Sequence, residues 1–123
     1  MGETILIVDD EYSLVESLSD ILGMEGYPIV SARNGRQALE VLERVHPSLL
    51  LLDFMMPVMD GIQLLEAMEQ KGLLAKIPVI LMTAAPMGLP KENRKWTALL
   101  IKPFELDELI SLVRRVLDTQ RAG

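Results

Sequence analysis

Residues 48–57 read SLLLLDFMMP, and this stretch decides the fold class. Its four consecutive leucines indicate a strand over 48–52 that is apolar on both faces. Strands buried on both faces are typical of parallel sheets that helices cover on either side. Asp53 follows the leucines directly, and burying its charge is costly unless a partner stabilises it. The stretch therefore predicts a layered α/β fold and a candidate site at the end of this strand.

Short apolar runs alternate with helical patterns along the rest of the chain. The predicted strands are 5–8, 27–32, 48–52, 78–82 and 98–101. The predicted helices are 12–24, 35–45, 61–71 and 105–118. Asn34 with Gln37, and Asp60 with Gln63, fit capping boxes at two helix starts. The tail 118–123 is predicted to fray.

The segment between the last two strands departs from this alternation. Residues 84–100 contain Pro86, Gly88 and Pro90, which oppose a full helix. The fourth helix is therefore predicted to be short or irregular. Together the patterns predict an α/β, doubly wound domain, with a five-stranded parallel sheet and helices on both faces.

Composition limits the function classes. With 123 residues, 50% hydrophobic and 24% charged, the chain is expected to form one domain over 1–123. The formal charge of −6 argues against direct binding to nucleic acid. No apolar run is long enough to span a membrane, and the first residues lack the features of a secretory signal. Cysteine is absent, so there is no disulfide framework, which fits a cytoplasmic location.

Polar side chains follow four of the predicted strands. Asp9 and Asp10 follow the first strand, Asp53 the third, Thr83 the fourth and Lys102 the fifth. The carboxyl ends of parallel strands share one edge of the sheet, so these residues are expected to converge. Adjacent carboxylates without histidine or cysteine favour Mg²⁺, while a lysine and a hydroxyl suit phosphate oxygens. The set predicts phosphoryl transfer, with Asp53 as the nucleophile.

The residues that carry this pattern also carry a family resemblance. The motifs are ILIVDDE (5–11), LLLDFMMPVMDG (50–61), VILMTA (79–84) and IKPF (101–104). In combination they resemble the receiver domain of two-component response regulators, including the chemotaxis regulators, from about Thr4 to Leu117. The resemblance implies a flavodoxin-like sheet with strand order 2-1-3-4-5. It also implies a cis peptide bond between Lys102 and Pro103.

The resemblance further implies roles for the site residues. Asp53 would receive a phosphoryl group from a histidine kinase or phosphotransfer protein, and Thr83 and Lys102 would contact its oxygens. The implied Mg²⁺ ligands are Asp9, Asp10, Asp53 and the backbone carbonyl of Met55. The implied activity is limited to the domain's own phosphorylation and slow self-dephosphorylation. Signalling would act on a downstream protein target that the sequence does not identify, and a homodimer stays open.

Two departures from the family pattern predict altered behaviour. Leu99 stands where many members carry an aromatic switch residue, and the stretch before Lys102 is shortened. We expect the phosphorylation chemistry to be intact and the output surface around the fourth helix to be rebuilt. Met55 and Ala85 occupy positions that influence water attack in the family. Neither side chain can orient water by hydrogen bonding, which predicts slow loss of the phosphoryl group.

Other interpretations stay open at this point. Asp9 and Asp10 also fit a helix cap, and Thr83 and Lys102 also fit ordinary surface positions. A receiver-like interaction module that is never phosphorylated is the main alternative. An aspartate-nucleophile hydrolase would need a D-x-D motif after the first strand, and the sequence there is DDE. Nucleotide binding is disfavoured because neither glycine-rich phosphate motif occurs.

Overall fold

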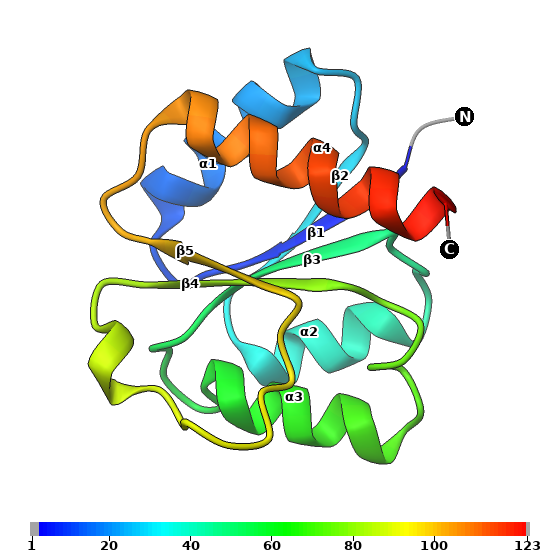
Figure 1. Cartoon of the computed structure of the whole chain (residues 1–123). Helices are drawn as coiled ribbons and strands as arrows, with labels where there is room; N and C mark the ends of the chain where they lie inside the picture. Colours follow the sequence, from blue (N-terminus) through cyan, green and yellow to red (C-terminus); the bar gives the residue numbers. More distant parts are fainter. Residues whose placement is uncertain (1–2, 123) are drawn as a thin grey trace.

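The structure is a computed structural model of the chain that describes residues 3–122 (Figure 1). The strands are β1 (Ile5–Val8), β2 (Ile29–Ala32), β3 (Leu49–Asp53), β4 (Val79–Thr83) and β5 (Ala98–Ile101). The helices are α1 (Tyr12–Met24), α2 (Gly35–Leu42), α3 (Gly61–Gln70), the 3₁₀ helix η1 (Pro86–Gly88) and α4 (Leu106–Ala122). The alternation predicted from the sequence is confirmed.

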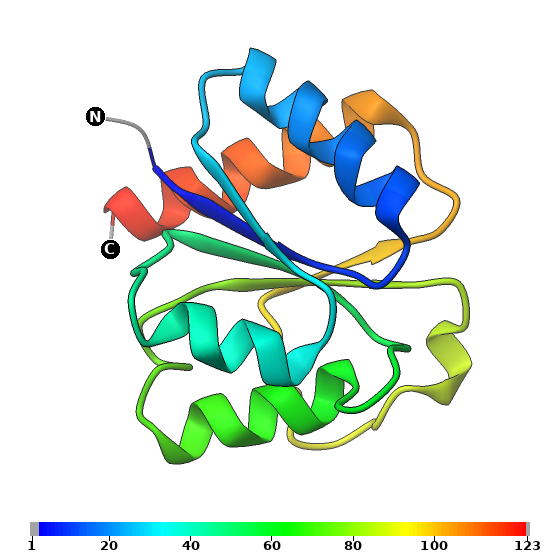
Figure 2. The same cartoon turned by 180° about the vertical axis from the view of Figure 1, so that it is seen from behind.

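The five strands form one parallel sheet in the order β2-β1-β3-β4-β5. Helices α1 and α4 cover one face, and α2 and α3 cover the other (Figures 1 and 2). The doubly wound α/β class and the strand order 2-1-3-4-5 are therefore confirmed. This arrangement puts the carboxyl ends of all five strands at one edge of the sheet.

The leucines of β3 explain why the sheet is covered on both sides. Leu50 and Leu52 belong to the buried cluster under α2 and α3, whereas Leu49 and Leu51 belong to the cluster under α1 and α4. All four side chains are fully buried. Burying one leucine stabilises the fold by roughly 1.5–3 kcal/mol, so β3 anchors both layers. A strand with this pattern requires cover on each face.

Two helix starts follow their capping residues, with one difference from the prediction. Asp60 and Gln63 form a complete capping box at the start of α3. Asn34 caps α2, but the Gln37 side chain accepts a hydrogen bond from the backbone N–H of Arg33, so that capping box is incomplete. The prediction of a capping box at Asn34 was therefore wrong for the hydrogen bond that the Gln37 side chain should accept from the Asn34 N–H.

The ends of two helices also differ from the prediction. Helix α2 ends at Leu42, not near residue 45, because its last turn tightens through a hydrogen bond from Arg44 N–H to the Val41 carbonyl. Helix α4 continues to Ala122, so the predicted fraying of 118–122 was wrong. No helix breaker lies in that stretch, and Arg121 pairs there with Glu3. Residue 123 lies outside the described residues.

The segment 84–97 contains only one short helix. Its η1 spans three residues, and the rest is irregular, which confirms the short fourth helix. Leu89 anchors the segment in the core, and Thr97 exchanges hydrogen bonds with Val79 of 2.7 and 3.0 Å. Within residues 3–122, no helix is both long and apolar enough to cross a membrane.

Candidate functional site

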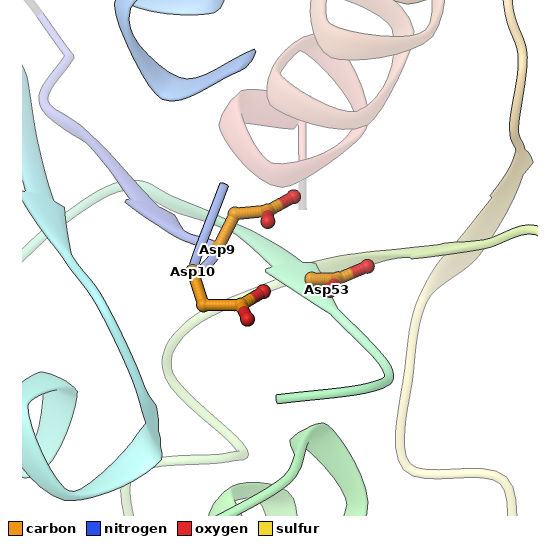
Figure 3. Close-up of side chains that lie close together, drawn as sticks. All are labelled: Asp9, Asp10 and Asp53. Atoms are coloured by element: carbon orange, nitrogen blue, oxygen red, sulfur yellow. The ribbon is translucent and has the colours of Figure 1, made fainter. Parts of the chain in front are cut away.

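The acids lie together at the carboxyl edge of the sheet. β1 and β3 are neighbours, and Val8 is paired with Leu52, so Asp9 and Asp53 lie side by side at the strand ends. Carboxylate oxygens of Asp9, Asp10 and Asp53 all lie within 4.8 Å of one another (Figure 3). Asp9 and Asp53 are buried and Asp10 is exposed. The cluster therefore opens to solvent on the Asp10 side.

Lys102, which directly follows the edge strand β5, reaches this cluster across β4. Its Nζ lies 3.1 Å from Asp9 Oδ2 and 3.0 Å from Asp53 Oδ1. The backbone fixes this approach, because the Lys102 N–H donates to the Thr83 carbonyl at 2.8 Å. The Lys102–Pro103 peptide bond is cis, as the resemblance implies. The lysine is thus the cation that stabilises the two buried carboxylates.

Burial and neighbouring charges shift the pKa values of Asp53 and Lys102. Burial raises the pKa of Asp53, and the nearby Asp9 and Asp10 carboxylates raise it further, against the lowering effect of Lys102. Burial alone lowers the pKa of Lys102, but hydrogen bonds to Asp53 and Asp9 outweigh it and leave that pKa raised. Lys102 is therefore firmly cationic, whereas the Asp53 charge is incompletely compensated. A site of this kind favours additional positive charge near Asp53.

Thr83 ends β4, next to β3. Met82 is the residue paired with Asp53, so Thr83 lies one position further along the neighbouring strand. Its buried hydroxyl oxygen accepts a hydrogen bond from the Ala85 N–H at 2.9 Å. A hydroxyl that accepts one bond keeps its own hydrogen for donation. Thr83 can therefore act as a donor at the same edge of the sheet.

The loop between β3 and α3 depends on two glycines that the sequence reasoning did not assign to the site. A Cβ at Gly61 would lie 2.6 Å from the Asp53 carbonyl oxygen, and the Gly61 N–H donates to the Phe54 carbonyl at 2.9 Å. A Cβ at Gly35 would lie 2.7 Å from Met59 Cγ. Both glycines let this loop close tightly behind Asp53. The signal available was the Asp60-Gly61 pair, of which the sequence pattern identified only Asp60, as a helix cap.

The structure thus brings together Asp9, Asp10, Asp53 and Lys102, with Thr83 on the adjoining strand. The remaining predicted ligand, Met55, lies two residues beyond Asp53 in the same loop. Three carboxylates, a lysine and a hydroxyl lie at the carboxyl edge of a doubly wound sheet. This combination is typical of an α/β domain that accepts a phosphoryl group. The functional roles of the individual residues stay predictions.

Comparison with known proteins establishes the family. Residues 5–114 match the model of the response regulator receiver domain, so the chain belongs to that family. It is a receiver domain of the two-component response regulators. Members of this family bind Mg²⁺ at an acidic site and interact with histidine kinases and downstream effectors.

Relatives agree with this assignment. The chain is 40% identical over 120 residues to sporulation initiation phosphotransferase F of Bacillus subtilis, covering 95% of each chain. It is 42% identical over 119 residues to regulatory protein AtoC of Escherichia coli, covering 94% of this chain and 25% of AtoC. It superposes on the response regulator TrrA of Thermotoga maritima, solved in complex with Mg²⁺-BeF, with a TM-score of 0.81. Identity to TrrA is 31%, over 94% of this chain and 99% of that chain.

Proposed function

We propose that Asp53 accepts a phosphoryl group from the phosphohistidine of a histidine kinase or phosphotransfer protein. The proposal rests above all on the convergence of Asp9, Asp10 and Lys102 on the Asp53 carboxylate. Phosphorylation then changes the conformation of the domain, and a downstream protein reads that change. The Bacillus relative, which matches along its length, carries the name of a phosphotransferase.

The transfer is a displacement at phosphorus. An Asp53 carboxylate oxygen forms the new P–O bond while the P–N bond to the donor imidazole breaks, and the imidazole nitrogen leaves with the electron pair of that bond. Lys102, already held 3.0 Å from Asp53, donates to one phosphoryl oxygen. The Thr83 hydroxyl donates to another. Both residues stabilise the negative charge that the equatorial oxygens carry.

The acidic cluster fits Mg²⁺ as its cofactor. Its donors are carboxylate oxygens alone, and hard oxygen ligands are what Mg²⁺ prefers. Asp9, Asp10 and Asp53 would hold the ion together with the Met55 backbone carbonyl. When bound, Mg²⁺ supplies positive charge that offsets repulsion between the carboxylates and the incoming phosphoryl oxygens. The incompletely compensated charge of Asp53 supports this proposal, as does the Mg²⁺-BeF complex of TrrA.

The acyl phosphate is expected to be long-lived. Water attack needs a side chain that orients the water, and Met55 and Ala85 offer no hydrogen-bonding group at the two positions that the family uses. We predict decay of phosphorylated protein over minutes or longer, followed by intact-mass spectrometry after removal of the donor. Loss within seconds would contradict this expectation.

The setting of the domain is proposed from its charge and composition. A net charge of −6 disfavours direct contact with nucleic acid or a membrane surface, and a sequence without cysteine fits protein partners in the cytoplasm. The signalling unit proposed here is a single receiver domain over 1–123. Two such domains could also associate as a homodimer.

A small phosphodonor tests the proposal against the unphosphorylated interaction module. The protein is incubated with acetyl phosphate and Mg²⁺, and intact mass is recorded with and without a chelator. We expect one phosphoryl group per chain, which requires Mg²⁺, is absent from Asp53→Asn, and is retained by the matched surface variant Asp107→Asn. No incorporation in the parent, or equal incorporation in Asp53→Asn, would favour the interaction module.

A further inference from the structure

The methionines of this chain differ widely in their access to solvent. Among residues 3–122, Met68 and Met82 are fully buried in the core. The exposed methionine side chains in that range are Met24, Met55 and Met87, at 86%, 67% and 88%. Thioether oxidation depends on access, so an oxidant in solution reaches these three sulfur atoms before the buried ones.

Met55 differs from the other two exposed methionines in its position beside the phosphoacceptor. The chain runs from Asp53, the last residue of β3, directly into the loop that holds Met55, beside the three acids (Figure 3). The flanking Phe54 and Met56 are partly buried against the core cluster under α2 and α3, whereas Met55 between them is open to solvent. Two residues of chain span at most about 7 Å, and a methionine side chain has three rotatable bonds. The Met55 sulfur can therefore reach the space beside a phosphoryl group on Asp53.

Oxidation changes how the Met55 side chain interacts with water. A thioether sulfur is a weak hydrogen-bond acceptor. Hydrogen peroxide converts it to a sulfoxide: an electron pair of the sulfur forms the S–O bond, the O–O bond breaks, and the peroxide is reduced to water. The sulfoxide oxygen carries a partial negative charge and accepts hydrogen bonds. Because the Met55 side chain is exposed, this change takes place without loss of core packing.

We propose that Met55 is an oxidation site whose sulfoxide shortens the lifetime of the phosphoryl group on Asp53. The sulfoxide oxygen accepts a hydrogen bond from a water molecule and holds that water beside the phosphorus. The water oxygen forms a new P–O bond while the P–O bond to Asp53 breaks, and the carboxylate leaves with the electron pair of that bond. One water proton passes to another oxygen of the released phosphate. The inference rests on the proposed phosphorylation of Asp53.

Peroxide treatment of the protein tests the inference. The protein is incubated with hydrogen peroxide, the peroxide is removed, and acetyl phosphate with Mg²⁺ is added. Intact mass follows loss of the phosphoryl group after removal of the donor, and peptide mass mapping identifies the oxidised methionines. We expect Met55 to be oxidised before Met68 and Met82. The oxidised protein should lose the phosphoryl group about fivefold faster than the unoxidised protein, the effect of one added hydrogen bond in the transition state.

Matched variants assign the effect to one sulfur atom. Each variant is compared with its own unoxidised sample. Met55→Leu is expected to show no acceleration after peroxide treatment, whereas the double variant Met24→Leu with Met87→Leu, which removes the other exposed thioethers, is expected to keep it. Methionine sulfoxide reductases reverse this oxidation, so treatment of the oxidised parent with them should restore slow decay.

A variant that needs no oxidant provides a second test. Met55→Gln places a permanent hydrogen-bond acceptor at this position and is expected to accelerate loss of the phosphoryl group, whereas Met24→Gln is not. Absence of phosphorylation in the unoxidised parent would overturn the proposed function and this inference together. Normal phosphorylation with equal decay before and after oxidation, or acceleration that persists in Met55→Leu, would overturn this inference alone.

Discussion

The half of the sheet that contains β1 and β3 differs from the half that contains β4 and β5. On the β1–β3 side, the strand ends hold Asp9 and Asp53 within a tight network behind fully buried leucines. On the β4–β5 side, the segment 84–97 holds three helical residues, a partly open β5 face and exposed cations. The difference teaches that the chemistry depends on the strand core, whereas the surface segment is attached to that core at few points and is free to change.

The comparison predicts unequal stability costs for equal truncations. Leu52→Ala removes a fully buried side chain directly before Asp53 and is expected to lower the free energy of unfolding by about 3–4 kcal/mol. Leu89→Ala, which truncates the 9% exposed anchor of the surface segment, is expected to cost about 1–2 kcal/mol. Urea titration measures both. Equal costs would show that the surface segment is as tightly integrated as the strand core.

Removing Lys102 tests whether the distant strand β5 contributes to the chemistry. Lys102→Ala deletes the cation that lies 3.0 Å from Asp53, so we expect the rate of phosphorylation by acetyl phosphate to fall about 100-fold. Lys76→Ala, at an exposed lysine far along the sequence, serves as the control and should leave the rate unchanged. Circular dichroism verifies that both variants are folded. An unaltered phosphorylation rate in Lys102→Ala would show that the residue following β5 does not contribute to the chemistry.

A smaller effect concerns pH and the incompletely compensated charge of Asp53. Its raised pKa means that the folded state binds the carboxyl proton more tightly than the unfolded state, so ionisation of Asp53 lowers stability as pH rises through the folded-state pKa. Asp53→Asn, which carries no charge, is therefore expected to be more stable than the parent at pH 7. The difference should shrink as pH falls through the raised pKa toward the ordinary value of 3.8.

Parallel urea titrations across this pH range, with Asp107→Asn as a control, measure that difference. A parent more stable than Asp53→Asn at neutral pH would mean that Lys102 overcompensates the buried carboxylate. The site would then need no additional cation.

Much of the fold was predictable because its signals are local. Four leucines in a row require cover on both faces, and strand–helix alternation then requires a parallel sheet whose carboxyl edge collects the polar residues. Close contacts between segments that meet only in the folded chain have no local sequence signal. That Gly61 must lack a side chain follows from its approach to the Asp53 carbonyl, which depends on how the loop closes in three dimensions.

The errors have a similar physical origin. Helix α4 extends to Ala122 because no residue breaks it and because Arg121 pairs with Glu3 near the other end of the chain. Residue patterns therefore predicted the strands well and missed the ends of two helices, α2 and α4.

The central claim is that acids from two neighbouring strands form one cation site on Asp53. Isothermal titration with Mg²⁺ tests it most directly, using the parent, Asp10→Asn, Asp53→Asn and the exposed control Asp107→Asn. We predict one Mg²⁺ per chain for the parent and the control, with strongly weakened binding in both site variants. No binding by the parent, or unchanged binding in Asp10→Asn and Asp53→Asn, would contradict the claim.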